Sequence, residues 1–124
     1  MRLLLDTHAA IWLLGPGGRI SDPAMDGFSD DSNEVLLSAV SVWEIALKRS
    51  LGKLEAPRDL VEQLTEVDVT ILPVSPDHAA AVEALPWHHR DPFDRLLVAQ
   101  AQIEKATILS ADPRLRAYDV EVLW

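Results

Sequence analysis

The sequence of 124 residues contains no cysteine, which excludes disulfide bonds and thiolate metal sites. It also lacks an apolar run near the ~20 residues that a membrane-spanning helix needs. Asp6, Thr7 and His8 interrupt the apolar amino-terminal segment, so the segment does not follow the pattern of a secretory signal. We therefore expect a cytoplasmic protein that has no membrane partner.

Several motifs of common enzyme classes are missing as well. Gly15-Pro16-Gly17-Gly18 is not followed by the Gly-Lys-Ser/Thr of a P-loop. No serine lies in a G-x-S-x-G nucleophile elbow, and His88-His89 lacks the ligand spacing of a zinc site. Repeats, low-complexity tracts and interdomain linkers are also absent, so residues 1–124 are expected to form a single domain.

Basic residues are scarce, with 11 Lys and Arg against 20 Asp and Glu, for a net charge of −9. Nucleic-acid-binding proteins are usually basic, so this balance argues against tight non-specific binding to nucleic acid. Carboxylates that bind divalent cations reverse their own local charge, however, so the composition stays compatible with a metal-dependent nuclease. The default expectation for the basic side chains is a solvated surface, including those of Arg19, Lys48, Arg49, Arg90 and Arg95.

The sequence does contain a regular alternation of strand and helix patterns. Strands are predicted at residues 2–5, 34–37, 69–74, 107–109 and 121–123. Helices are predicted at residues 7–14, 21–29, 38–51, 60–67, 76–85 and 93–105, with a helical turn at 113–117. Such alternation is typical of βαβ crossovers and a parallel sheet. We therefore predict an α/β fold, a three-layer α/β/α domain with a mostly parallel central sheet.

Four acidic residues lie where strands end or helices begin, namely Asp6, Glu44, Asp94 and Asp112. Each has a purely structural interpretation. Asp6 has the features of a turn residue, and Ser41 to Glu44 matches a capping box. Asp91-Pro92 and Asp112-Pro113 each match an N-cap followed by proline at the first helical position.

In a parallel sheet, however, all strand ends and the helix starts that follow them lie at one edge of the molecule. The four carboxylates are therefore expected to meet there. Each close pair would repel by up to ~4 kcal/mol at 4 Å with an effective dielectric near 20. Such a cluster needs protons or cations to neutralise it. Oxygen ligands alone favour a hard ion such as Mg²⁺ or Mn²⁺, which suits phosphoryl chemistry. The His88-His89 loop is expected to form a polar rim of this site.

Four segments carry a resemblance to a known family: "LLLDTHAAIWLL", "SAVSVWEIALKRSLGKL", "HHRDPFDRLLVAQA" and "TILSADPRLRAYDVEVLW". Together they resemble a PIN-domain protein, and more narrowly a VapC-type ribonuclease toxin of a type II toxin–antitoxin system. The resemblance implies an endoribonuclease dependent on Mg²⁺, with Mn²⁺ as a substitute. It implies that Asp6, Glu44, Asp94 and Asp112 are the catalytic and metal-binding acids.

The same resemblance suggests that Thr7 and Ser110 orient a ligand or water. It implies an RNA substrate, a homodimer and a cognate antitoxin that covers the active site. Hydrolysis by a metal-activated water would leave a 5′-phosphate and a 3′-hydroxyl.

Two alternatives remain open at this point. A Mg²⁺-dependent phosphoacceptor receiver domain has a similar length and fold class. Such a domain needs an acidic pair after the first strand and a late lysine after a strand, whereas Asp6 stands alone and Lys105 falls in a predicted helix. The second alternative is a non-catalytic PIN-like binding module, which four intact acids disfavour.

Overall fold

A computed structural model describes residues 1–16 and 19–124 and shows one central parallel sheet. The strands, in the spatial order β3-β2-β1-β4-β5, are β1 (Arg2–Leu5), β2 (Glu34–Ser38), β3 (Thr70–Leu72), β4 (Thr107–Leu109) and β5 (Val122–Leu123). The α-helices are α1 (Thr7–Leu14), α2 (Asp22–Ser29), α3 (Ala39–Ser50), α4 (Leu60–Glu66), α5 (Pro76–Ala81) and α6 (Pro92–Glu104). Short 3₁₀ helices η1 (Val82–Ala84) and η2 (Pro113–Ala117) complete the fold.

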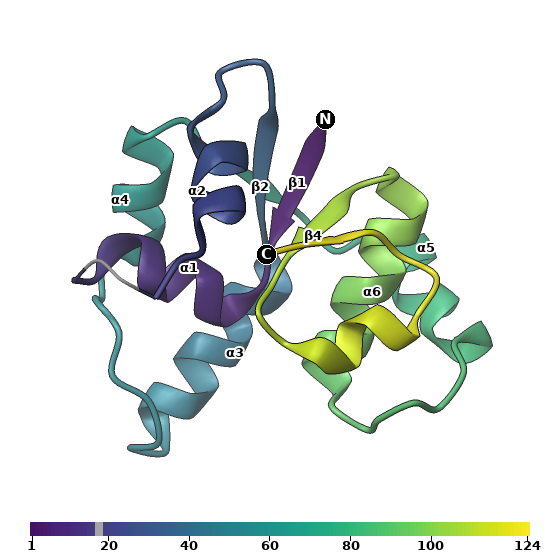
Figure 1. Cartoon of the computed structure of the whole chain (residues 1–124). Coiled ribbons are helices and arrows are strands. Elements are labelled where there is room, and N and C mark those ends of the chain that lie inside the picture. Colours follow the sequence, from purple (N-terminus) through teal and green to yellow (C-terminus); the bar gives the residue numbers. More distant parts are fainter. Residues whose placement is uncertain (17–18) are drawn as a thin grey trace.

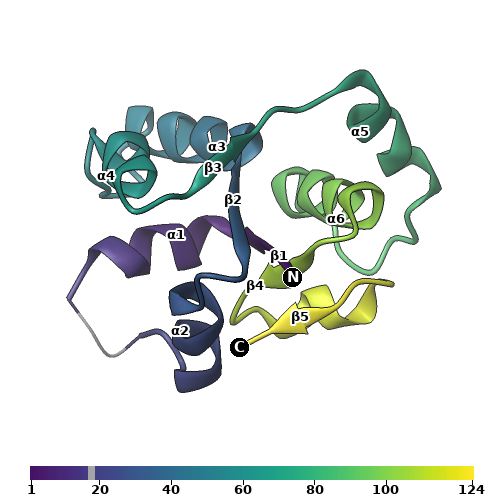
Figure 2. The same cartoon turned by 90° about the horizontal axis from the view of Figure 1, so that it is seen from above.

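Helices cover both faces of the sheet, as Figure 2 shows end-on, with α1, α2, α3 and α4 on one side and α5 and α6 on the other. Alternate strand residues divide the core in two. Leu4 and Leu36 belong to the cluster that contains the α6 residues, whereas Leu3, Leu5 and Leu37 belong to the cluster against α1 and α4. Burying each such leucine contributes about 1.5–3 kcal/mol. The predicted three-layer α/β/α architecture is confirmed.

Most element boundaries agree with the sequence prediction to within one or two residues. The 76–85 helix is shorter than predicted, because α5 ends at Ala81 and the chain continues as η1. The predicted 69–74 strand contracts to Thr70–Leu72 at the edge of the sheet, since Pro73 has no N–H to extend the ladder. The glycine run after α1 stops that helix at Leu14, although Gly17 and Gly18 lie outside the described residues.

The connections leave the sheet in opposite directions on either side of β1. β1 pairs with β2 on one flank and with β4 on the other, so a topological switch point lies between β1 and β4. Open α/β sheets bind their ligands at the carboxyl ends of the strands beside such a point. Figure 1 shows α1 and α3 starting at this edge of the sheet. None of the helices that the structure describes is long and apolar enough to span a bilayer.

Candidate active site

A cavity of about 170 Å³ opens at the carboxyl-terminal edge of the sheet, and all four acids singled out in the sequence line it. A fifth carboxylate, Asp91, joins them. The remaining lining residues are Thr7, His8, Lys48 and Arg114. Five carboxylates against two permanent cations leave three uncompensated negative charges when every carboxylate is ionised. The expected convergence of Asp6, Glu44, Asp94 and Asp112 is therefore present in the structure.

Asp6 directly follows β1 and is the N-cap of α1. Its Oδ1 accepts a hydrogen bond from the backbone N–H of Ala9 at 2.7 Å, and its Oδ2 accepts one from the hydroxyl of Ser110, which follows β4. The backbone N–H of Asp6 also donates to Leu109 O at 3.1 Å, across the switch point. Burial raises the pKa of Asp6, although the bonds from Ser110 and Ala9 oppose the rise. Ser110 thus orients the carboxylate itself.

Glu44 projects from the second turn of α3 and is buried. Its Oε1 accepts a hydrogen bond from the Thr7 hydroxyl at 2.6 Å, and its Oε2 lies 2.5 Å from Lys48 Nζ. The capping-box interpretation of Ser41 to Glu44 is wrong. The helix begins earlier, because Ser38 is the N-cap and accepts from Val40 N–H at 3.0 Å. The Glu44 side chain therefore has no orphan backbone donor to reach.

Asp91 and Asp94 occupy the start of α6 and have different surroundings. Asp91 is the predicted N-cap, with its Oδ1 accepting from the N–H groups of Phe93 and Asp94 at 2.9 and 3.1 Å. Burial raises the pKa of Asp94 to about 6, and repulsion from Asp91 and Glu44 adds to the rise. A hydrogen bond from His89 acts in the opposite direction. Ionising Asp94 in the folded protein therefore has an electrostatic cost.

Asp112 caps η2 through its Oδ1, which accepts from the Arg114 N–H at 2.9 Å. The Arg114 guanidinium also lies 2.7 Å from Asp112 Oδ2, and this pairing holds the pKa of Asp112 below its usual value. The same guanidinium lies 4.0 Å from Asp94 Oδ2. Arg114 thus spans two of the acids from an exposed position.

The chemistry of the donor set fits a hard divalent cation. Carboxylate and hydroxyl oxygens surround the cavity, and these are the ligands that such an ion prefers. The positive charge of the ion would offset the excess negative charge of the carboxylates. Across residues 1–16 and 19–124, no three Asp, Glu or His side chains are arranged to hold an ion as they stand. Lys48 and Arg114 pair with Glu44 and Asp112 instead. A cation bound by Glu44 or Asp112 would therefore compete with Lys48 or Arg114 for that carboxylate.

Sequence reasoning missed several side chains that support the site. Lys48 was detectable, because an i,i+4 spacing from Glu44 favours an ion pair on a helix. Arg95 is buried rather than solvated, contrary to expectation. His89 does lie beside the acids, as predicted for a rim loop, and in addition contacts Asp94 directly. Tyr118, which binds His89, comes from a distant part of the chain with no local pattern to mark it.

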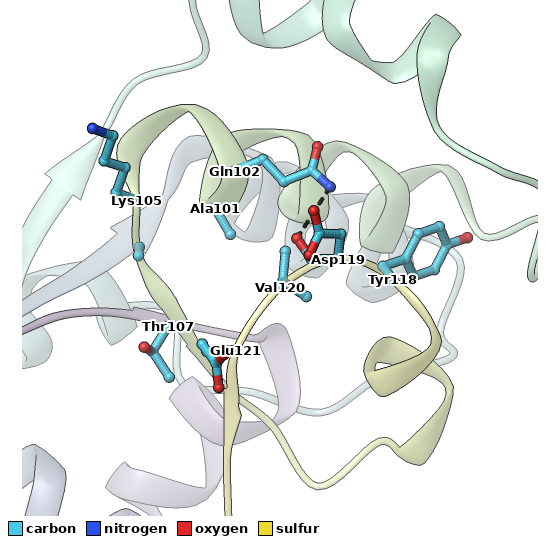
Figure 3. Close-up of a pocket in the computed structure, with 9 residues that line it drawn as sticks. Ala101, Gln102, Lys105, Thr107, Tyr118, Asp119, Val120 and Glu121 are labelled. Carbon is cyan, nitrogen blue, oxygen red and sulfur yellow. Dashed lines mark hydrogen bonds between the residues drawn. The ribbon is translucent and has the colours of Figure 1, made fainter.

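A second cavity, of about 360 Å³, lies at the opposite edge of the sheet near the start of β4 (Figure 3). Its lining includes Lys105, Thr107 and Glu121. Gln102 donates there to the backbone carbonyl of Asp119 at 3.3 Å. None of the four acids lines it, so the chemistry expected from the sequence belongs to the other edge.

Solved structures share this fold over nearly the whole chain. VapBC2 from Rickettsia felis, bound to a DNA fragment from its promoter, matches with a TM-score of 0.71 and 14% identity, covering 98% of this chain and 96% of that one. FitAcB from Neisseria gonorrhoeae matches with a TM-score of 0.65 and 22% identity, covering 97% and 95%. FitAB bound to an IR36 DNA fragment matches with 0.64 and 20%, covering 97% and 92%.

A comparison with curated protein sequences finds no match. The PIN domain model, however, matches residues 3–121. The receiver-domain alternative is wrong on this ground, and the strand order also differs from the 2-1-3-4-5 order of receiver domains. The match includes strands β2, β3 and β4, nearly all of β1 and all four acids, and it ends directly before β5. The chain therefore belongs to the PIN domain family.

Proposed function

We propose that this protein is a metal-dependent endoribonuclease of the VapC type, the toxin of a toxin–antitoxin pair. One observation carries the proposal: in a PIN domain, Asp6, Glu44, Asp94 and Asp112 line one cavity with more negative charge than the protein's own cations neutralise. Holding like charges together is unfavourable. A cluster of this kind suits a site whose partner is a cation.

The four acids would hold Mg²⁺, or Mn²⁺ in its place. When bound, the ion would supply Lewis-acid chemistry, neutralising the scissile phosphate and acidifying the attacking water. The chain's own residues orient the ligands: Ser110 fixes Asp6, and Thr7 fixes Glu44. Lys48 and Arg114 pair with Glu44 and Asp112 in this structure, and from these positions they would contact phosphates of the RNA. We propose that Thr7 and Ser110 orient a ligand or water through the carboxylates to which they donate.

The proposed partners follow from the same family relationship. VapBC2 and FitAB are two-component assemblies whose solved structures contain DNA. We infer that this chain likewise pairs with an antitoxin, which covers the acidic cavity, and that it forms a homodimer in the cytoplasm. RNA is the proposed substrate of the free toxin.

Cleavage by the Asp6→Asn variant tests this proposal. The substitution keeps a cap acceptor for Ala9 but removes a charge from the cavity, so RNA cleavage with Mg²⁺ is expected to disappear while the fold persists. Mapping of 5′-phosphate ends in RNA after induction provides the measurement. Asp31→Asn, an exposed acid outside the cavity, serves as the matched control. Wild-type cleavage by Asp6→Asn would exclude the proposed site.

A further inference from the structure

A chain of hydrogen bonds runs from the interior of the protein to the rim of the acidic cavity. Arg95 Nη1 lies 3.3 Å from the Tyr118 hydroxyl, which lies 2.8 Å from His89 Nδ1. His89 Nε2 in turn lies 3.2 Å from Asp94 Oδ2. Arg95 and Tyr118 are both 4% exposed, and the His89 side chain is 8% exposed. The chain is therefore shielded from water along most of its length.

One arrangement of the hydrogens satisfies every contact in this series of hydrogen bonds. Arg95 is always a donor, so the Tyr118 oxygen accepts from it. The single hydroxyl hydrogen of Tyr118 is then directed to His89 Nδ1, which acts as an acceptor. The remaining ring hydrogen lies on Nε2 and points to Asp94 Oδ2, because an ionised carboxylate accepts hydrogen bonds and has none to donate. In this arrangement Nε2 is the nitrogen through which His89 donates to Asp94.

The inner end of the chain is firmly held. The Arg95 guanidinium donates to the backbone carbonyls of Pro86, Val82 and Leu85, at 2.8, 3.2 and 3.3 Å. It also stacks 3.7 Å from the centre of the Trp87 ring. These contacts tie α6 to the loop that precedes His89. They leave the imidazole ring little freedom to rotate, since both of its nitrogens are engaged.

We propose that His89 is a positioning residue that fixes the rotation of the Asp94 carboxylate for cation binding. The bond from Nε2 engages Oδ2, whereas Oδ1 accepts no hydrogen bond from any residue in the described ranges 1–16 and 19–124. Oδ1 is thereby the oxygen left available to the cavity. Outer hydrogen-bond partners of this kind orient metal ligands and change metal affinity by about 10–100-fold when removed. This inference rests on the proposed metal site.

Two substitutions at position 89 separate the contact of His89 with Tyr118 from its contact with Asp94. In His89→Asn the amide reaches only the position of Nδ1, so the contact with Tyr118 is retained and the donor to Asp94 is lost. In His89→Gln the amide reaches the position of Nε2 and keeps that donor. His88→Asn is the matched control, because exposed His88 touches the Tyr118 ring edge-on at 4.8 Å and none of the acids.

In the experiment each purified variant is titrated with Mn²⁺ alone, and isothermal calorimetry measures the binding. Thermal melts of the same variants in EDTA measure their stability without metal. We expect His89→Asn to bind Mn²⁺ at least about tenfold more weakly than wild type, with an unchanged melting temperature in EDTA. His89→Gln and His88→Asn should stay near the wild-type affinity. In cleavage assays His89→Asn should lower kcat and leave KM for RNA near the wild-type value.

Asp94→Asn distinguishes the possible failures. Wild-type Mn²⁺ affinity in His89→Asn, alongside weakened binding in Asp94→Asn, would overturn the role of His89 and leave the metal site standing. Wild-type Mn²⁺ affinity in Asp94→Asn would contradict the proposed metal site itself. Equal losses in His89→Asn and His89→Gln, accompanied by lower melting temperatures in EDTA, would show that His89 serves only the fold.

Discussion

Individual carboxylates in this protein serve the fold and line the cavity at the same time. Asp6, Asp91 and Asp112 each use Oδ1 to accept from the backbone at a helix start, and all three line the acidic cavity. A carboxylate has two oxygens and about four acceptor positions, so a cap leaves capacity for a ligand. The capping and functional interpretations of these residues were therefore never exclusive.

The pair Asp91 and Asp94 gives the sharpest residue-scale prediction. Asp91→Ala removes two backbone hydrogen bonds at the start of α6 and is expected to cost about 0.5–2 kcal/mol of unfolding free energy. Asp94→Asn should abolish nearly all cleavage with little loss of stability, since it retains the acceptor for His89. Thermal melts and cleavage assays of both variants provide the measurement. Equal loss of Mn²⁺ binding in the two would make Asp91 a fifth ligand.

At the scale of elements, the sequence predicts what local patterns encode. The apolar run 3–5 followed by Asp6, and the Asp91-Pro92 start of α6, are local features, and both are found where predicted. The edge at which the acids meet also follows, because it requires only that the strands be parallel. The partners of Glu44 and Asp94 were not predictable, since Thr7 and His89 reach them through tertiary contacts. Strand order likewise has no local pattern.

Arg95 shows how a charged residue can serve as the link between two elements. Its planar guanidinium donates hydrogen bonds to three backbone carbonyls at once, and the single ammonium group of lysine cannot reproduce this arrangement. Arg95→Lys is expected to lower the unfolding free energy by about 1.5–3 kcal/mol, the range for a hydrogen bond of a charged group. Chemical denaturation measures the effect, with exposed Arg90→Lys as control. A loss in Arg95→Lys no larger than that in Arg90→Lys would contradict a linking role.

For the whole molecule, the net charge of −9 combines with the acidic cavity to make stability depend on pH. The pKa of Asp94 is about 6 in the folded state, above its ordinary value of 3.8, so the fold favours the protonated carboxyl. This contribution is fully present below about pH 4 and is lost as pH rises through 6. Asp112 has the opposite sign, because its lowered pKa stabilises the fold at higher pH.

A comparison of wild type with Asp94→Asn measures the contribution of this carboxyl together with its repulsion from Asp91 and Glu44. In EDTA the two should be about equally stable near pH 4. By pH 7.5 the wild type should be less stable by up to about 3 kcal/mol, since one pKa unit corresponds to about 1.4 kcal/mol.

Millimolar Mn²⁺ at pH 7.5 should then raise the melting temperature of the wild type, because the ion binds the folded cluster and not the dispersed chain. Asp94→Asn should respond far less. Calorimetry across pH with and without Mn²⁺ measures both effects, and a stability difference that does not vary with pH would show that Asp94 ionises in the folded protein without cost.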